Sequence, residues 1–164
     1  MTAARSEIAP GDRRSAARVA AVQALYQVEV GGGAIEAVID EFIEHRLGVA
    51  IDGAPVVETN AELFAELVRG AAERRDELDA LISGALVEGW RMERLELVLR
   101  AVLRAGTFEL LARPAAPARV VIDEYVDVAH AFFANSVPGF VNGVLDRLAR
   151  DLRPAEFDAP DGPE

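Results

Sequence analysis

The amino-acid sequence predicts an all-α protein made of two packed three-helix bundles. Apolar residues recur at the three- and four-residue spacing of amphipathic helices along most of the chain. Ala, Leu, Glu and Arg dominate the composition, and these residues favour helices, whereas aromatic residues make up only 6%. No run of alternating β-branched residues indicates a strand. The 51% share of hydrophobic residues is large enough for a packed core.

Three helical segments are expected in the first half of the chain. Asp12 is the candidate N-cap of the first segment, and the glycines at 31–33 end it. Thr59 or Asn60 can cap the third segment, which is either one long helix or two abutting helices. The expected segments cover about residues 12–30, 35–46 and 60–85.

Three more helices are expected in the second half. Pro114 and Pro154 stop the first and the last of them, because proline cannot continue a helix. Pro138 falls in the first turn of the last helix, where its missing N–H costs nothing. The apolar stripes lie within about residues 95–113, 122–135 and 137–153. We therefore expect a single domain over 12–153, with sub-bundles of about 12–85 and 86–153, a mobile lead (1–11) and an acidic disordered tail (154–164).

The charge of the chain is unevenly distributed. All 17 basic residues are arginines, and 28 acidic residues bring the net charge to −11. Residues 1–28 carry +2, residues 29–79 carry −9, and residues 80–153 are neutral. A nucleic-acid-binding protein usually shows a basic surface, so RNA binding would need a local patch, and only the N-terminal segment is net positive. The acidic segment suits a basic partner protein or is an ordinary solvated surface.

Several classes of site and location are excluded or disfavoured by composition. The chain has no cysteine and two histidines, which excludes disulfides, iron–sulfur clusters, thiolate zinc sites and a multi-histidine metal site. We expect no metal and no cofactor. No apolar stretch approaches the roughly 18 residues of a membrane helix, and the N-terminus lacks the apolar run of a signal peptide. A cytoplasmic protein is therefore expected.

Two groups of charged residues are candidates for function. Arg13, Arg14 and Arg18 fall in the first turns of a helix, whose amides favour anions, and an arginine fork suits phosphate oxygens. The alternative is a solvated, salt-bridged helix start. A second group, with His130, could serve acid–base chemistry, although acids on an amphipathic helix usually form its solvated side. This group comprises Asp123, Glu124 and Asp127.

Three segments resemble the NusB family of bacterial transcription antitermination factors. The first, residues 13–26, reads RRSAARVAAVQALY. The second is AVLR at 101–104, followed by FEL at 108–110. The third is FVNGVLD at 140–146, preceded by the acidic helix of Asp123 and Glu124. The order and spacing of the three match the family, and the resemblance covers about residues 12–153.

The resemblance implies a function in transcription without catalytic activity. NusB-like proteins are all-α, with two three-helix bundles. They pair with NusE, a small-subunit ribosomal protein, and the pair binds the boxA element of nascent RNA. The pair then helps to load an antitermination complex on RNA polymerase during ribosomal RNA synthesis.

The resemblance also implies which residues of this sequence meet each partner. Phe140 could stack on an RNA base, or it could pack in the core beside Val137 and Val144. Two departures from the family pattern, Pro138-Gly139 and Leu99, bear on the RNA and NusE contacts respectively. The implied RNA-binding residues are Arg13, Arg14, Arg18, Arg104 and Phe140, and the implied NusE-binding residues are Tyr26 and Glu93.

Three other functions remain open from the sequence. One is the NusB-like domain of some RNA cytosine methyltransferases, which would need a following catalytic domain with a cysteine. Another is a helical protein–protein adaptor without RNA binding, in which the arginines form a solvated face. The third is a small hydrolase that uses Asp123, Glu124 and His130.

Overall fold

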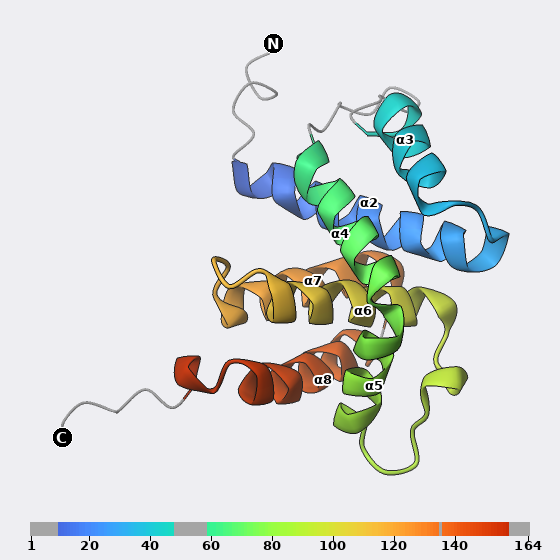
Figure 1. Ribbon diagram of the computed structural model, residues 1–164. Helices are drawn as coiled ribbons and strands as arrows, with labels where there is room; N and C mark the ends of the chain where they lie inside the picture. The colour runs from blue at the N-terminus through green and yellow to red at the C-terminus, as the bar shows by residue number, and fades with distance from the viewer. Residues whose placement is uncertain (1–9, 48–58, 135, 158–164) are drawn as a thin grey trace. The chain divides into compact units, whose positions relative to one another are not determined.

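The computed structural model describes residues 10–47, 59–134 and 136–157 (Figure 1). These residues form helices and no strand, which confirms the predicted all-α class. The long helices are α2 (Pro10–Gly31), α3 (Ile35–His45), α4 (Ala61–Glu73), α5 (Arg75–Ala85), α6 (Leu97–Ala112), α7 (Ala118–Phe132) and α8 (Val137–Leu152), with short 3₁₀ helices η1 (Met92–Arg94) and η2 (Pro154–Glu156). No helix among the described residues is long and apolar enough to span a membrane.

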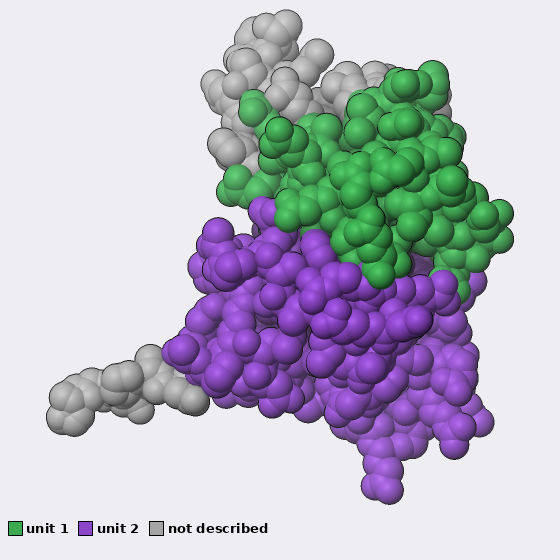
Figure 2. All heavy atoms as spheres, in the orientation of Figure 1, with its two compact units in different colours: residues 1–73 green, residues 74–164 purple. Residues whose placement is uncertain are grey.

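The chain divides into two compact units, residues 1–73 and 74–164, coloured separately in Figure 2. The sequence suggested a boundary near residue 85, whereas the contacts place it between Glu73 and Arg74. The expected third segment is two abutting helices, α4 and α5, which meet at Arg74. The boundary falls there because α5 packs on α6 and α8 rather than with the first three helices.

The first unit is a bundle of α2, α3 and α4. Its core includes a stacked pair of rings, Phe42 and Phe64, whose centroids lie 5.4 Å apart. The helix α2 begins at Pro10, so the predicted cap Asp12 lies inside its first turn. The helix ends near Gly32, which has a φ of +67° that glycine adopts without strain.

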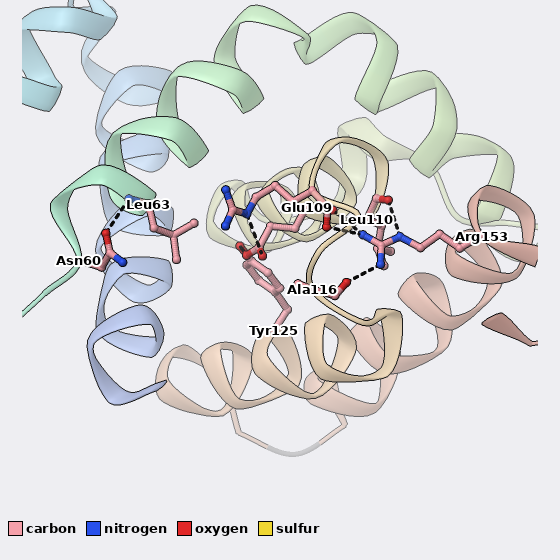
Figure 3. Close-up of polar contacts among 8 residues, drawn as sticks. Asn60, Leu63, Glu109, Leu110, Ala116, Tyr125 and Arg153 are labelled. Atoms are coloured by element: carbon pink, nitrogen blue, oxygen red, sulfur yellow. Dashed lines mark hydrogen bonds and ion pairs between the residues drawn. The ribbon is translucent and has the colours of Figure 1, made fainter. Parts of the chain in front are cut away.

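The start of α4 is fixed by Asn60, one of the two predicted caps. Its side-chain oxygen Oδ1 accepts a hydrogen bond of 2.9 Å from the backbone N–H of Leu63 (Figure 3). The backbone N–H of Asn60 donates to the carbonyl oxygen of Arg13 at 3.1 Å. This bond ties the beginning of α4 to the beginning of α2, and the latter carries the arginines singled out in the sequence.

The second unit is arranged around α6. Residues 101–110 are all buried, and α6 packs against α5, α7 and α8. Gly106 makes close packing possible, since a Cβ there would lie 3.0 Å from Leu145 Cδ1 and 3.2 Å from Tyr125 Cγ. The fully buried Glu109 accepts a 2.6 Å hydrogen bond from the Tyr125 hydroxyl (Figure 3).

The C-terminal end of α6 is capped by the guanidinium of Arg153. An arginine has five N–H donors, and each of those of Arg153 has an acceptor. Nε donates to the carbonyl of Leu110 at 2.8 Å. The Nη groups donate to the carbonyls of Glu109 and Ala116 (Figure 3). They also donate to the carbonyl of Arg113 and to the carboxylate of Glu156. The last carbonyls of a helix lack partners within it, so this side chain completes the end of α6.

Part of the predicted C-terminal tail is also ordered against the second unit. Glu156 Oε1 accepts a 2.8 Å hydrogen bond from the backbone N–H of Ala118, at the start of α7. This bond, together with the one from Arg153, lowers the pKa of Glu156. The Phe157 ring lies near two guanidinium carbons, 5.1 Å from that of Arg119 and 4.7 Å from that of Arg150. Residues 1–9 of the predicted lead and 158–164 of the tail lie outside the described residues.

Candidate functional site

The arginines at the start of α2 differ in exposure. Arg14 is exposed, Arg13 is half-buried, and Arg18 is only 4% exposed. The family resemblance implied an RNA contact for all three. The structure differs because Arg18 lies on the packed face of the helix, three and four residues before the buried Ala21 and Val22.

The second implied RNA-binding region lies in the second unit, at the start of α8. The Phe140 ring is half-buried and its centroid lies 5.2 Å from that of Trp90. Trp90 precedes η1 and is 50% exposed. Phe140 is therefore neither a core residue nor an isolated surface ring, because it forms a surface aromatic pair. Sequence reasoning missed Trp90, although a lone tryptophan directly after the loop glycine Gly89 was a visible signal.

Arg104 does not lie on the surface. It is 6% exposed, and its Nε and Nη2 atoms lie 2.7 and 3.0 Å from the two carboxylate oxygens of Asp79. This bidentate ion pair joins α6 to α5. The sequence implied an RNA contact for Arg104, whereas its burial and pairing correspond to a structural role within the second unit.

The two residues implied for partner binding are both accessible. Tyr26 is 40% exposed in the last turns of α2. Glu93 is exposed within η1, and its carbonyl accepts a 2.8 Å hydrogen bond from Arg100 Nη2. Arg100 also donates from Nε to the carbonyl of Leu95 at 2.9 Å, so it fixes the backbone that carries Glu93.

The acidic group on α7 lies mostly on the surface of the second unit. Asp123, Asp127 and His130 are exposed and Glu124 is half-buried. Within the described part of the chain, no three His, Cys, Asp or Glu side chains are placed to hold a metal ion. The exposure of these residues corresponds to the solvated side that acids on an amphipathic helix usually form.

Comparisons with known proteins identify the family. The NusB family model matches residues 15–150. The transcription antitermination protein NusB of Maricaulis maris is 51% identical over 144 residues, which are 88% of this chain and 90% of that protein. A T. maritima NusB structure aligns with a TM-score of 0.72 and 32% identity, over 88% of this chain and 96% of that one.

A further solved structure contains the antitermination factors NusB and NusE in complex with double-stranded RNA. It aligns with a TM-score of 0.69 and 26% identity, over 84% of this chain and 96% of that chain. Family model, relatives and structures agree over nearly the whole length of the described helices. The chain belongs to the NusB family.

Proposed function

We propose that this chain is an RNA-binding transcription antitermination factor that pairs with NusE and binds boxA RNA during ribosomal RNA transcription. The observation that carries the proposal is the 51% identity to an antitermination protein NusB over 88% of this chain. Such a factor binds and recruits, and needs no catalytic group or cofactor. Its place of action is the cytoplasm, where bacterial transcription occurs.

The partners follow from the same relationship. In a solved relative, NusB is assembled with NusE and RNA. The acidic residues of this chain suit a basic ribosomal protein, because complementary charge steers association. Tyr26 and Glu93, both exposed, are the proposed contacts with NusE.

Of the five residues implied for RNA binding, we propose as RNA contacts only those that solvent reaches. Arg13 and Arg14 bind phosphates, and their position on α2 is fixed by the bond from Asn60 to Arg13. Phe140 stacks on a base, as aromatic side chains do in single-stranded RNA recognition. Arg18 and Arg104 are buried, and we assign them to holding α2 and α6 in place.

The alternatives are less well supported. The chain covers 90% of its relative from Maricaulis maris, a protein named for antitermination and not for methyl transfer. A helical adaptor without RNA binding is the alternative that an experiment must separate. Labelled boxA RNA, titrated with this chain in the presence of NusE, separates them, since an adaptor leaves the RNA affinity of NusE unchanged.

Replacing both Arg13 and Arg14 with alanine is expected to weaken RNA binding about tenfold. Each phosphate contact on a single strand contributes about 0.7 to the slope of log affinity against log salt concentration, so the slope should fall by about 1.4. The measurement is RNA titration at several salt concentrations. The matched control is the Arg46→Ala, Arg69→Ala double variant, which removes the same charge from exposed ion pairs of the first unit. Equal salt slopes in the two double variants would contradict the assignment.

Tyr26→Asp is expected to abolish association with NusE while the melting temperature changes little. The side chain is 40% exposed, so the new carboxylate remains solvated in the free protein, but binding would bury it without a partner. Calorimetric titration with NusE and a thermal melt make the two measurements. Ile43→Asp is the control, since Ile43 is 41% exposed on α3 of the same unit. A Tyr26→Asp protein that fails to fold would show that the ring is part of the core.

A further inference from the structure

The chain between α5 and η1 is held against one face of α8. Arg147 Nε on α8 donates a 2.7 Å hydrogen bond to the carbonyl oxygen of Ala85, at the end of α5. Five residues later, the Trp90 ring packs on Phe140 with an angle of 48° between the ring planes. Phe140 and Arg147 are seven residues apart, so they lie on the same face of the helix. The connection is therefore anchored at two points along that face.

The turn that presents Trp90 is well defined. The backbone N–H of Trp90 donates to the carbonyl of Val87 at 3.1 Å, which closes a four-residue turn. Gly89 occupies the third position with a φ of +97°, a conformation that side chains other than glycine rarely adopt. The indole is thus fixed by its backbone and by one ring contact, yet 50% of the residue remains exposed.

The bond to Ala85 uses only Nε of Arg147 and leaves its two Nη groups for other contacts. Its Nη1 and Nη2 atoms lie beside Gly143, 3.6 and 3.9 Å from where a Cβ would stand. Among the described residues these two nitrogens form no hydrogen bond and no ion pair. The neighbouring Asp146 is paired with Arg150 instead. Up to four N–H donors and a full positive charge are therefore available next to the aromatic pair.

We propose that Trp90 and Arg147 extend the RNA site at Phe140, with one base stacked on the Trp90 indole and a neighbouring phosphate bound by the Nη groups of Arg147. The inference rests on the proposed RNA-binding function. An aromatic surface beside a cation is the combination that binds single-stranded RNA, because bases stack and phosphates need positive charge. The occupant is a single-stranded segment, since a base paired in a duplex cannot reach the indole face.

Trp90 is the only tryptophan of the chain, so its fluorescence reports on the site directly. Titration with boxA RNA is expected to quench the emission, with a midpoint equal to the dissociation constant obtained from labelled RNA. Trp90→Leu is expected to weaken RNA binding about tenfold, within the range measured for stacking of one base. Val87→Ala is the matched control, because Val87 belongs to the same turn and is 48% exposed.

The contribution of Arg147 is tested through salt dependence. Arg147→Gln is expected to lower the salt slope by about 0.7, the value for one phosphate on a single strand. Arg119→Gln removes the same charge from the start of α7, where Arg119 lies over Phe157 and away from Phe140 at the start of α8. It should leave the slope nearly unchanged. Thermal melts verify that each variant is folded.

The outcomes separate this inference from the proposed function. Unchanged Trp90 emission in a protein that binds RNA through Arg13 and Arg14 would overturn the inference and leave the function standing. Loss of NusE binding by Trp90→Leu, with RNA binding intact, would identify the patch as a protein contact and would also overturn it. A wild-type chain that binds no RNA, even with NusE present, would overturn both. Quenching of the wild-type protein supports the inference even where a variant fails to fold.

Discussion

Arg153→Met is expected to lower the free energy of unfolding by about 3–5 kcal/mol, the range found when a buried charged partner is removed. The guanidinium gives all five N–H groups to acceptors at the end of α6, in the following loop and in η2. Methionine preserves much of the apolar stem but supplies no donor. The carbonyls of Leu110 and Ala116 would then lose the arginine as donor. Those of Glu109 and Arg113 would keep only their backbone bonds, from the N–H groups of Arg113 and Ala116. Thermal and urea denaturation measure the effect, and the melting temperature should fall by roughly 10 °C.

Arg150→Met is the matched control for this substitution. Arg150 lies three residues earlier, in the last turn of α8, and its ion pair with Asp146 is exposed, with 54% and 34% of the two side chains accessible. Exposed ion pairs contribute about 0–1 kcal/mol, so the control should remain close to wild type. Arg153→Lys should be intermediate, because it retains the charge but has three donors instead of five. Similar losses for Arg150→Met and Arg153→Met would contradict the capping role.

Most of the helices were predictable because they have an apolar stripe of the right period. The residue at which each helix begins was harder to predict. Asp12 shows this, because it resembles an N-cap but lies inside α2. Pro10 is itself favoured in the first turn of a helix, so the sequence offered two different starting points for α2, Pro10 and Asp12. Asn60 was predictable, since it precedes an uninterrupted stripe and bonds the N–H of Leu63.

The division of the chain could not be predicted in the same way. Periodicity indicates which face of a helix is buried but not which other helix covers it. The apolar residues of α5 continue the spacing of those in α4, yet α5 packs on α6 and α8. That choice depends on specific pairs such as Arg147 with the Ala85 carbonyl, which are 62 residues apart.

The buried arginines were the principal surprise at the candidate site. Arginines in an acidic chain are expected on the surface, because arginine is rarely buried without a partner. Arg104 and Glu109 nevertheless occur within α6, where every residue from 101 to 110 is buried. Polar residues inside such an apolar run were the available signal that each has a partner in the protein, as Arg104 has in Asp79.

The ion pair of Arg104 leads to the second large expected effect. Arg104→Met is expected to lower the free energy of unfolding by about 2 kcal/mol, less than for a fully buried pair because 27% of the Asp79 side chain is accessible. The substitution leaves the Asp79 carboxylate partly desolvated without its bidentate partner. RNA affinity and its salt slope should be unchanged, since only 8% of the Arg104 side chain is accessible.

Arg75→Met provides the control, because Arg75 pairs with the same carboxylate of Asp79 at 3.9 Å but from an exposed position, with 49% of its side chain accessible. It should change stability by less than about 1 kcal/mol. Urea denaturation of both variants, combined with RNA titration at two salt concentrations, distinguishes a structural arginine from an RNA contact. A structural Arg104 lowers stability and leaves the salt slope unchanged. A slope reduced by about 0.7 in a protein of unchanged stability would instead mean that Arg104 leaves Asp79 to bind a phosphate. In that case the RNA contact that the family resemblance implied for Arg104 would be correct, and its pairing would describe only the RNA-free protein.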